Sequence, residues 1–209
     1  MTSTTVHLAV YDTFADWEPG FATAQLTQHG RTVRTVGLTT APVTTMGGMR
    51  VLPDLALDEL DPGDSELLIL TGASLWDSGD ALAPFARAAR TFLDAGVPVA
   101  AICGATAGLA REGLLDDRAH TSAVSFYLAA TGYAGGAHYV EADAVTGADA
   151  GAASGTAPRG ALVTAGPTEP VAFAREIFGL LGVFEPKKLD AWYRLFHDSD
   201  ASAYEVLEG

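Results

Sequence analysis

Short apolar runs alternate along the chain with segments in which apolar residues recur every three or four positions. Apolar runs of this kind are typical of parallel strands that are buried on both faces, and the three-to-four spacing is typical of amphipathic helices. Strands are predicted at residues 6–11, 32–38, 67–70, 97–102, 137–144 and 161–165. Helices are predicted at residues 16–30, 82–96, 105–111, 125–131 and 171–181. The alternation predicts an α/β protein with a mostly parallel central sheet.

Two segments interrupt this alternation. Residues 43–53 hold Gly47-Gly48 between two β-prone pieces, which predicts an inserted hairpin. Residues 146–160 are mostly Gly, Ala, Ser and Asp, so they have little to bury, and we expect a mobile loop.

No linker is long enough to divide two hydrophobic cores, so we expect one domain over residues 1–185. A C-terminal helical extension is expected over residues 186–209, after Pro186. Its apolar stripe includes Trp192 and Phe196, and it packs either on the body of the domain or against a second subunit.

The predicted chemical centre is the stretch at residues 97–106, where a buried strand ends at Cys103 and a helix follows. A side chain on such a sharp turn projects into the crevice at the carboxyl edge of the sheet, where ligands bind. The N-terminus of the following helix can lower the pKa of a thiol at this position. The alternative is an inert, buried cysteine that packs as a small hydrophobe. The strand before Cys103 and the small Gly104 after it favour the reactive thiol.

The charge and composition of the chain exclude several classes of partner and cofactor. A net charge of −14 repels phosphate backbones and anionic lipids, so we expect neither nucleic acid nor a membrane as a partner. The sequence shows no signal segment and no apolar run long enough for a membrane span, which predicts a cytoplasmic protein. No spacing of histidines, cysteines or carboxylates indicates a metal site, and the first loop is too acidic to cradle a phosphate. We therefore expect no metal and no flavin or dinucleotide cofactor.

Four segments together resemble the ThiJ/PfpI superfamily, the parkinsonism-associated deglycase relatives of the class I glutamine amidotransferases. They are residues 16–20 (DWEPG), 70–73 (LTGA), 100–106 (AAICGAT) and 162–166 (LVTAG). The resemblance spans most of the chain. It implies a flavodoxin-like three-layer sandwich and a homodimer.

The resemblance also implies roles for particular residues. Glu18 would be the acidic residue that lies against the sulfur of Cys103. Backbone N–H groups near Gly72, Ala73 and Gly104 would form an oxyanion hole.

Glu18 can also be considered without the resemblance. An ionised carboxylate would repel a neighbouring thiolate, so the pair makes sense only if the carboxyl is protonated and donates a hydrogen bond. The alternative is that Glu18 merely occupies the first turn of a helix, where an acidic side chain interacts favourably with the helix dipole.

Departures from the family pattern restrict the expected chemistry. Protease-like members carry a histidine directly after the cysteine, where this chain has Gly104. Class I amidotransferases carry a His-x-Glu pair late in the chain, and the corresponding residues 165–169 of this chain contain no histidine. Peptidase and glutaminase activities are therefore disfavoured. His120 lies near the position of a histidine in deglycase-like members, which makes it a candidate base.

Two functions follow as hypotheses. In the first, the protein is a cofactor-independent enzyme in which Cys103 attacks a small carbonyl or amide-like substrate and Glu18 moves the proton. In the second, it is a redox-sensing or stress-response protein whose Cys103 is oxidised to a sulfenic or sulfinic acid without turnover. A family member with an inert thiol is a third alternative. The expected partner is a small-molecule substrate or an oxidant.

Overall fold

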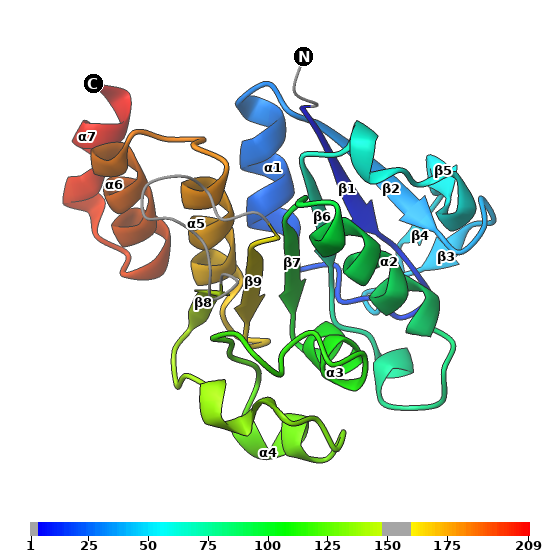
Figure 1. Cartoon of the computed structure of the whole chain (residues 1–209). Coiled ribbons are helices and arrows are strands. Elements are labelled where there is room, and N and C mark those ends of the chain that lie inside the picture. Colours follow the sequence, from blue (N-terminus) through cyan, green and yellow to red (C-terminus); the bar gives the residue numbers. More distant parts are fainter. Residues whose placement is uncertain (1–3, 148–159) are drawn as a thin grey trace.

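The computed structural model describes residues 4–147 and 160–209, and its centre is a seven-stranded sheet in the order β5-β2-β1-β6-β7-β9-β8 (Figure 1). Its strands are β1 (Thr5–Ala9), β2 (Thr32–Gly37), β5 (Leu55–Ala56), β6 (Leu67–Leu70), β7 (Val99–Ile102), β8 (Ala144–Gly147) and β9 (Leu162–Ala165). β8 runs antiparallel to β9, and the other strand pairs of the sheet are parallel. The predicted α/β class and mostly parallel sheet are confirmed.

Burial explains why the central strands form where the sequence predicts them. Every residue of β6, β7 and β9 is buried, as expected for apolar strands covered on both faces. The parallel register pairs Leu68 with Val99 and Ile102 with Ala165, so the three strands end at the same edge of the sheet.

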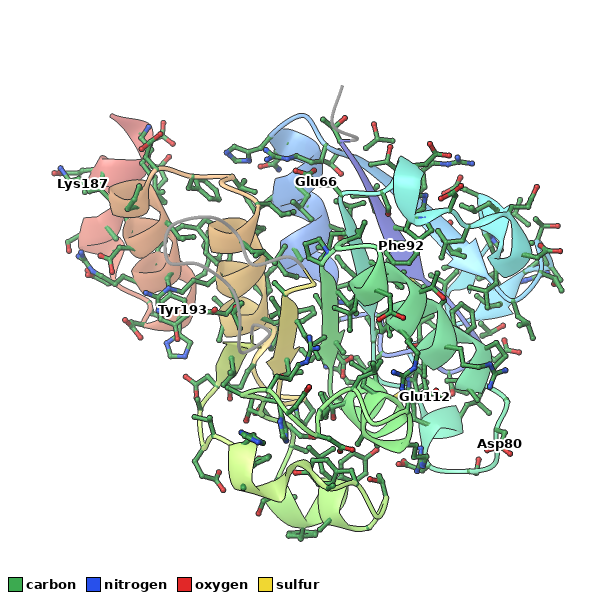
Figure 2. The ribbon with its side chains drawn as sticks, in the orientation of Figure 1. Glu66, Asp80, Phe92, Glu112, Lys187 and Tyr193 are labelled. Atoms are coloured by element: carbon green, nitrogen blue, oxygen red, sulfur yellow. The ribbon has the colours of Figure 1, made fainter. Side chains whose placement is uncertain are left out.

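Helices cover both faces of the sheet and make a three-layer sandwich (Figure 1). α1 (Gly20–Gln28) packs against α5 (Pro170–Leu180), and α2 (Ala83–Asp94) packs against α3 (Gly104–Arg111). Phe92 of α2, labelled in Figure 2, is buried against the sheet. The remaining helices are α4 (Ser125–Ala129), α6 (Pro186–His197) and α7 (Tyr204–Glu208), and the 3₁₀ turns are η1 (Leu57–Glu59), η2 (Pro62–Asp64), η3 (Ser74–Trp76), η4 (Gly135–His138) and η5 (Ala201–Ala203).

The C-terminal helix α6 packs on α5 and α1 outside the sandwich. Trp192 is 2% exposed, and its ring lies 4.9 Å from that of Phe178 and 6.3 Å from that of Phe21. This chain alone therefore covers Trp192, whereas Phe196 of the same stripe is 43% exposed.

The inserted hairpin is confirmed as β3 (Val43–Thr44) and β4 (Arg50–Val51). The helix predicted from residue 16, however, begins only at Gly20, so Asp16 lies in the loop before α1. Its Oδ2 accepts hydrogen bonds from Thr45 Oγ1 at 2.5 Å and from the Gly47 N–H at 3.2 Å. The carboxylate thus ties the hairpin to the first loop.

The prediction of a strand over residues 137–144 is wrong. The 3₁₀ turn η4 extends to His138, and β8 begins only at Ala144, the last residue of the predicted range. The intervening backbone makes one isolated bridge, between Tyr139 and His120, and does not join the sheet. Of the loop predicted at residues 146–160, positions 146 and 147 belong to β8, and positions 148–159 lie outside the described residues.

The strand order creates a natural ligand site. From β1 the chain crosses to β2 on one side, and from β6 it crosses to β7 on the other, so the connections diverge between β1 and β6. Ligands in open α/β sheets bind at the carboxyl edge beside such a point. In the described part of the chain, no helix has the length and apolar character needed to cross a bilayer.

Replacing Trp192 with Ala should lower the free energy of unfolding by about 3–5 kcal/mol, because it leaves a cavity between α6, α5 and α1. Urea denaturation measures the change. Tyr204→Ala is the matched control, since Tyr204 is 55% exposed and its replacement should have little effect. Equal losses in the two variants would contradict the assigned packing of α6.

Candidate active site

Cys103 lies on a strained turn between β7 and α3. Its backbone has φ 58° and ψ −128°, a conformation that costs a non-glycine residue on the order of 1–3 kcal/mol. Hydrogen bonds on both sides hold it: the Cys103 N–H donates to the Ala165 carbonyl at 3.0 Å, and Thr106 Oγ1 donates to the Cys103 carbonyl at 2.6 Å. The turn predicted from the sequence is confirmed, and it presents the partly exposed thiol at the carboxyl edge of the sheet.

Glu18 reaches the same place from the loop after β1. Its side chain is fully buried, and Oε2 accepts a 2.6 Å hydrogen bond from the Gly72 N–H. Oε1 meets no donor in good hydrogen-bond geometry among the described residues. Instead it faces the sulfur of Cys103, and a methyl group built on Gly72 would lie 2.8 Å from that sulfur and 2.9 Å from Oε1. The structure therefore brings Cys103, Glu18 and Gly72 into contact.

The surroundings of the pair favour protonated forms of both groups. Burial raises the pKa of Glu18 to about 7, against the opposing effects of the Gly72 N–H and the Cys103 thiol. Burial, followed by the charge of Glu18, raises the pKa of Cys103 to about 12, and the Gly104 N–H only partly offsets this. The helix N-terminus thus does not lower the pKa of the thiol as expected from sequence, because desolvation outweighs it.

The two groups are best described as one titrating pair. When Glu18 is protonated, its charge no longer opposes the thiolate, and its O–H can donate toward the sulfur. A thiolate beside a carboxylic acid and a thiol beside a carboxylate contain the same number of protons. The two arrangements differ only in the position of one proton, and the raised pKa of Cys103 favours the thiol beside the carboxylate.

The expected oxyanion hole needs correction at one position. The Gly72 N–H already donates to Glu18, so it is not free to stabilise an oxyanion. The Gly104 N–H is directed at the Cys103 sulfur, where it lowers the pKa of the thiol. Ala73 has an extended backbone and lies beside Gly104, whose built methyl group would be 3.3 Å from the Ala73 carbonyl oxygen. The candidate donors are therefore the backbone N–H groups of Ala73 and Gly104.

His120, the candidate base, is held by partners other than the thiol. Its Nδ1 lies 2.9 Å from the Arg118 carbonyl oxygen and its Nε2 lies 3.1 Å from the Tyr133 hydroxyl, so both ring nitrogens have partners. Burial lowers the pKa of His120, which keeps the ring neutral at neutral pH. The side chain is fully buried and packs against Tyr133 and Tyr139. We assign His120 a structural role.

Sequence reasoning missed two residues that interact electrostatically with the thiol. The Tyr127 hydroxyl in α4 donates a 2.7 Å hydrogen bond to Asp77 Oδ1, at the end of η3. The charge of Asp77 contributes to the raised pKa of Cys103, after burial and Glu18. Burial and the bond to Asp77 raise the pKa of Tyr127, and Cys103 adds to this increase. Nothing in the local sequence indicates this pair, because α4 reaches the site only by packing against α3.

Gly72→Ala should disrupt the site by steric overlap, because the added methyl group would lie under 3.0 Å from both Cys103 and Glu18. We expect a loss of about 1–3 kcal/mol in the free energy of unfolding, together with a changed rate of Cys103 alkylation. Gly136→Ala is the matched control, since no atom lies within 4 Å of its added methyl group. Wild-type behaviour of Gly72→Ala would refute the close approach.

Glu18→Gln should change how stability depends on pH. In the wild type the folded pKa of about 7 exceeds the ordinary value of 4.5, so stability held by the protonated carboxyl is lost as the pH rises through this window. Between pH 5 and pH 8 the wild type should lose roughly 2 kcal/mol more than Glu18→Gln, which cannot ionise. Urea denaturation of both proteins at the two pH values measures this difference. Equal pH dependence would show that the Glu18 pKa is not raised.

Comparison with known proteins shows the family of this chain. The DJ-1/PfpI family matches residues 4–179. "Uncharacterized protease YoaZ" of Bacillus subtilis (strain 168) is 36% identical over 206 residues, which cover 93% of this chain and 91% of that protein. "Uncharacterized protease YdeA" of the same organism is 31% identical over 183 residues, covering 87% of this chain and 85% of that protein.

Solved structures give the same result. A thiJ/pfpI family protein from Bacillus anthracis superposes with a TM-score of 0.88 at 34% identity, covering 100% of this chain and 97% of that one. The DJ-1 superfamily protein Atu0886 from Agrobacterium tumefaciens superposes with a TM-score of 0.80 at 34% identity, covering 95% of this chain and 99% of that one. The resemblance seen in the sequence motifs is confirmed, and the chain belongs to the DJ-1/PfpI family.

Proposed function

We propose that this protein is a cofactor-independent enzyme that uses Cys103 to attack a small carbonyl or amide-like substrate. The observation that carries the proposal is the fully buried Glu18 carboxyl, whose unpartnered Oε1 faces the Cys103 sulfur. A buried carboxyl with a pKa near neutrality is suited to accept and return a proton. The strained turn that presents the thiol supports the same role.

The first step is addition of the thiol to the carbonyl carbon. The S–H proton passes to Glu18, a bond forms between sulfur and carbon, and the π electrons of the carbonyl move to its oxygen. The N–H groups of Ala73 and Gly104 would stabilise this developing oxyanion. With an aldehyde, Glu18 returns the proton to the oxygen and gives a hemithioacetal, so the charge of the site is restored.

An amide-like substrate would need two further steps. Collapse of the tetrahedral intermediate breaks the carbon–nitrogen bond, and Glu18 delivers its proton to the leaving amine. Water then hydrolyses the thioester left on Cys103, which releases the acid and restores the thiol. Two relatives have names that include "protease", which raises peptide bonds as substrates. Against this, the elbow has Gly104 where protease-like members place a histidine, and His120 is bonded to Arg118 and Tyr133. Small, more electrophilic substrates fit these residues better than peptides.

Redox sensing is the second candidate function, and the same Glu18 Oε1 supports it. Attack of the thiolate on hydrogen peroxide forms a sulfur–oxygen bond, breaks the oxygen–oxygen bond and releases water, leaving a sulfenate, the deprotonated form of the sulfenic acid. A second equivalent gives the sulfinic acid. The buried Oε1 has no other partner in the described residues, so a protonated Glu18 could donate to the new oxygen.

Turnover of small aldehydes and amides by the wild type, Cys103→Ser and Glu18→Gln separates these functions. For an enzyme, Cys103→Ser should fall to the uncatalysed rate and Glu18→Gln should lose about 100-fold in kcat because proton transfer is removed. Exposed Glu59→Gln is the matched control. Turnover that persists in Cys103→Ser would eliminate a thiol mechanism. No turnover, combined with peroxide adding two oxygen atoms to Cys103 by intact mass, would favour the redox function.

A further inference from the structure

A second group of chemically active side chains lies outside the Cys103 site. Asp143 precedes β8, Glu169 precedes α5, and His197 ends α6. One possible ligand atom from each lies within 4.8 Å of the other two. His197 Nε2 is 3.7 Å from Asp143 Oδ2. Three separate elements thus direct one nitrogen and two carboxylate groups toward a common point.

The imidazole of His197 is held in the orientation that a ligand needs. Its Nδ1 lies 2.6 Å from Asp198 Oδ1, so the ring can donate its proton to Asp198 and leave the Nε2 lone pair toward Asp143 and Glu169. The ring also stacks on Tyr193 at 4.5 Å and 18°, and Figure 2 shows Tyr193 on α6 beside α5. Metal-bound histidines characteristically donate their second N–H to such a carboxylate.

Among the described residues, the ion-pair partner of Asp143 and Asp198 is His197 itself, which is charged only when protonated. In the described part of the chain, no lysine or arginine forms an ion pair with Asp143, Glu169 or Asp198. The guanidinium group of Arg175 lies over the ring of Tyr193, at 4.4 Å from its centroid. Carboxylates gathered without such partners repel one another, and a divalent cation would relieve this repulsion.

The group borders a cavity of about 410 Å³ at the carboxyl edge of the sheet. Asp143 and Glu169 line the cavity together with Ser122, whose hydroxyl is 2.7 Å from that of Thr106 in α3. Thr106 in turn holds the Cys103 carbonyl. An ion bound by the three side chains would therefore keep coordination positions open toward a space that adjoins the elbow.

We propose that Asp143, Glu169 and His197 form a binding site for a divalent transition-metal ion, with Asp198 as the residue that orients His197. One imidazole nitrogen with two carboxylates suits ions from Mn²⁺ to Zn²⁺, whereas Mg²⁺ and Ca²⁺ prefer oxygen ligands alone. The remaining coordination positions would take water or an oxygen atom of a small ligand in the cavity. The expectation of no metal site rested on short sequence spacings, which these three residues do not have.

Calorimetric titration of chelator-treated protein with ZnCl₂ and, separately, MnCl₂ tests the site. We expect one ion per chain, both in the wild type and in Cys103→Ser, which removes the competing thiol ligand. His197→Gln should weaken binding by more than about 10-fold, and Asp198→Asn, which keeps all three ligands, by about 10-fold. His29→Gln is the matched control, because His29 is an exposed histidine at the end of α1 and should bind as the wild type does.

Circular dichroism and urea midpoints confirm that each variant is folded. If His197→Gln fails to fold, Asp198→Asn decides the question. The proposal is overturned by the absence of saturable binding of either ion, by binding that survives in the His197 and Asp198 variants, or by binding that disappears only in Cys103→Ser. None of these measurements depends on Cys103 having catalytic activity.

Discussion

The hydrogen bond from the Gly72 N–H to Glu18 Oε2 is the interaction on which the arrangement of the site depends. It joins the loop after β1 to the loop after β6, and the Ala15 N–H strengthens the connection by donating to the Gly72 carbonyl at 2.8 Å. Without this donor, a fully buried carboxyl oxygen would lose its partner at a cost of a few kcal/mol. The position of Glu18 beside Cys103 thus follows from the parallel pairing of β1 with β6 and of β6 with β7.

Burial also decides the electrostatics of the pair. The site has one backbone donor for Glu18 and one for the sulfur of Cys103, which is too little to stabilise two adjacent negative charges away from water. One proton therefore remains with the pair over a wide pH range. A helix N-terminus alone would favour a thiolate, whereas burial here favours the protonated thiol.

The proposed cation site lies on the far side of β9 from Glu18, yet it borders the same edge of the sheet. The two sites are connected through Ser122 and Thr106, which lie between the cavity and the Cys103 backbone. A bound ion would place positive charge on the cavity wall of a protein whose net charge is −14. That charge would attract oxygen-rich or anionic small molecules toward the elbow.

The sequence by itself determined the central strands, the turn at Cys103 and the family, because apolar runs and small residues around a turn are local signals. The sequence also indicated Glu18 as a site residue, through its place in the segment at residues 16–20 that resembles the family. Tertiary structure alone decided that Gly72 donates to Glu18, that His120 is bonded to Arg118 and Tyr133, and that Tyr127 donates to Asp77.

The same division applies to protonation and to the proposed cation site. A helix N-terminus can be predicted from sequence, but the burial that raises the pKa of Cys103 depends on how segments distant in the chain pack over it. Asp143, Glu169 and His197 come together for the same reason, since β8, α5 and α6 meet only after the sheet has formed. Local patterns specify elements, whereas contacts between loops depend on the strand order that places those loops side by side.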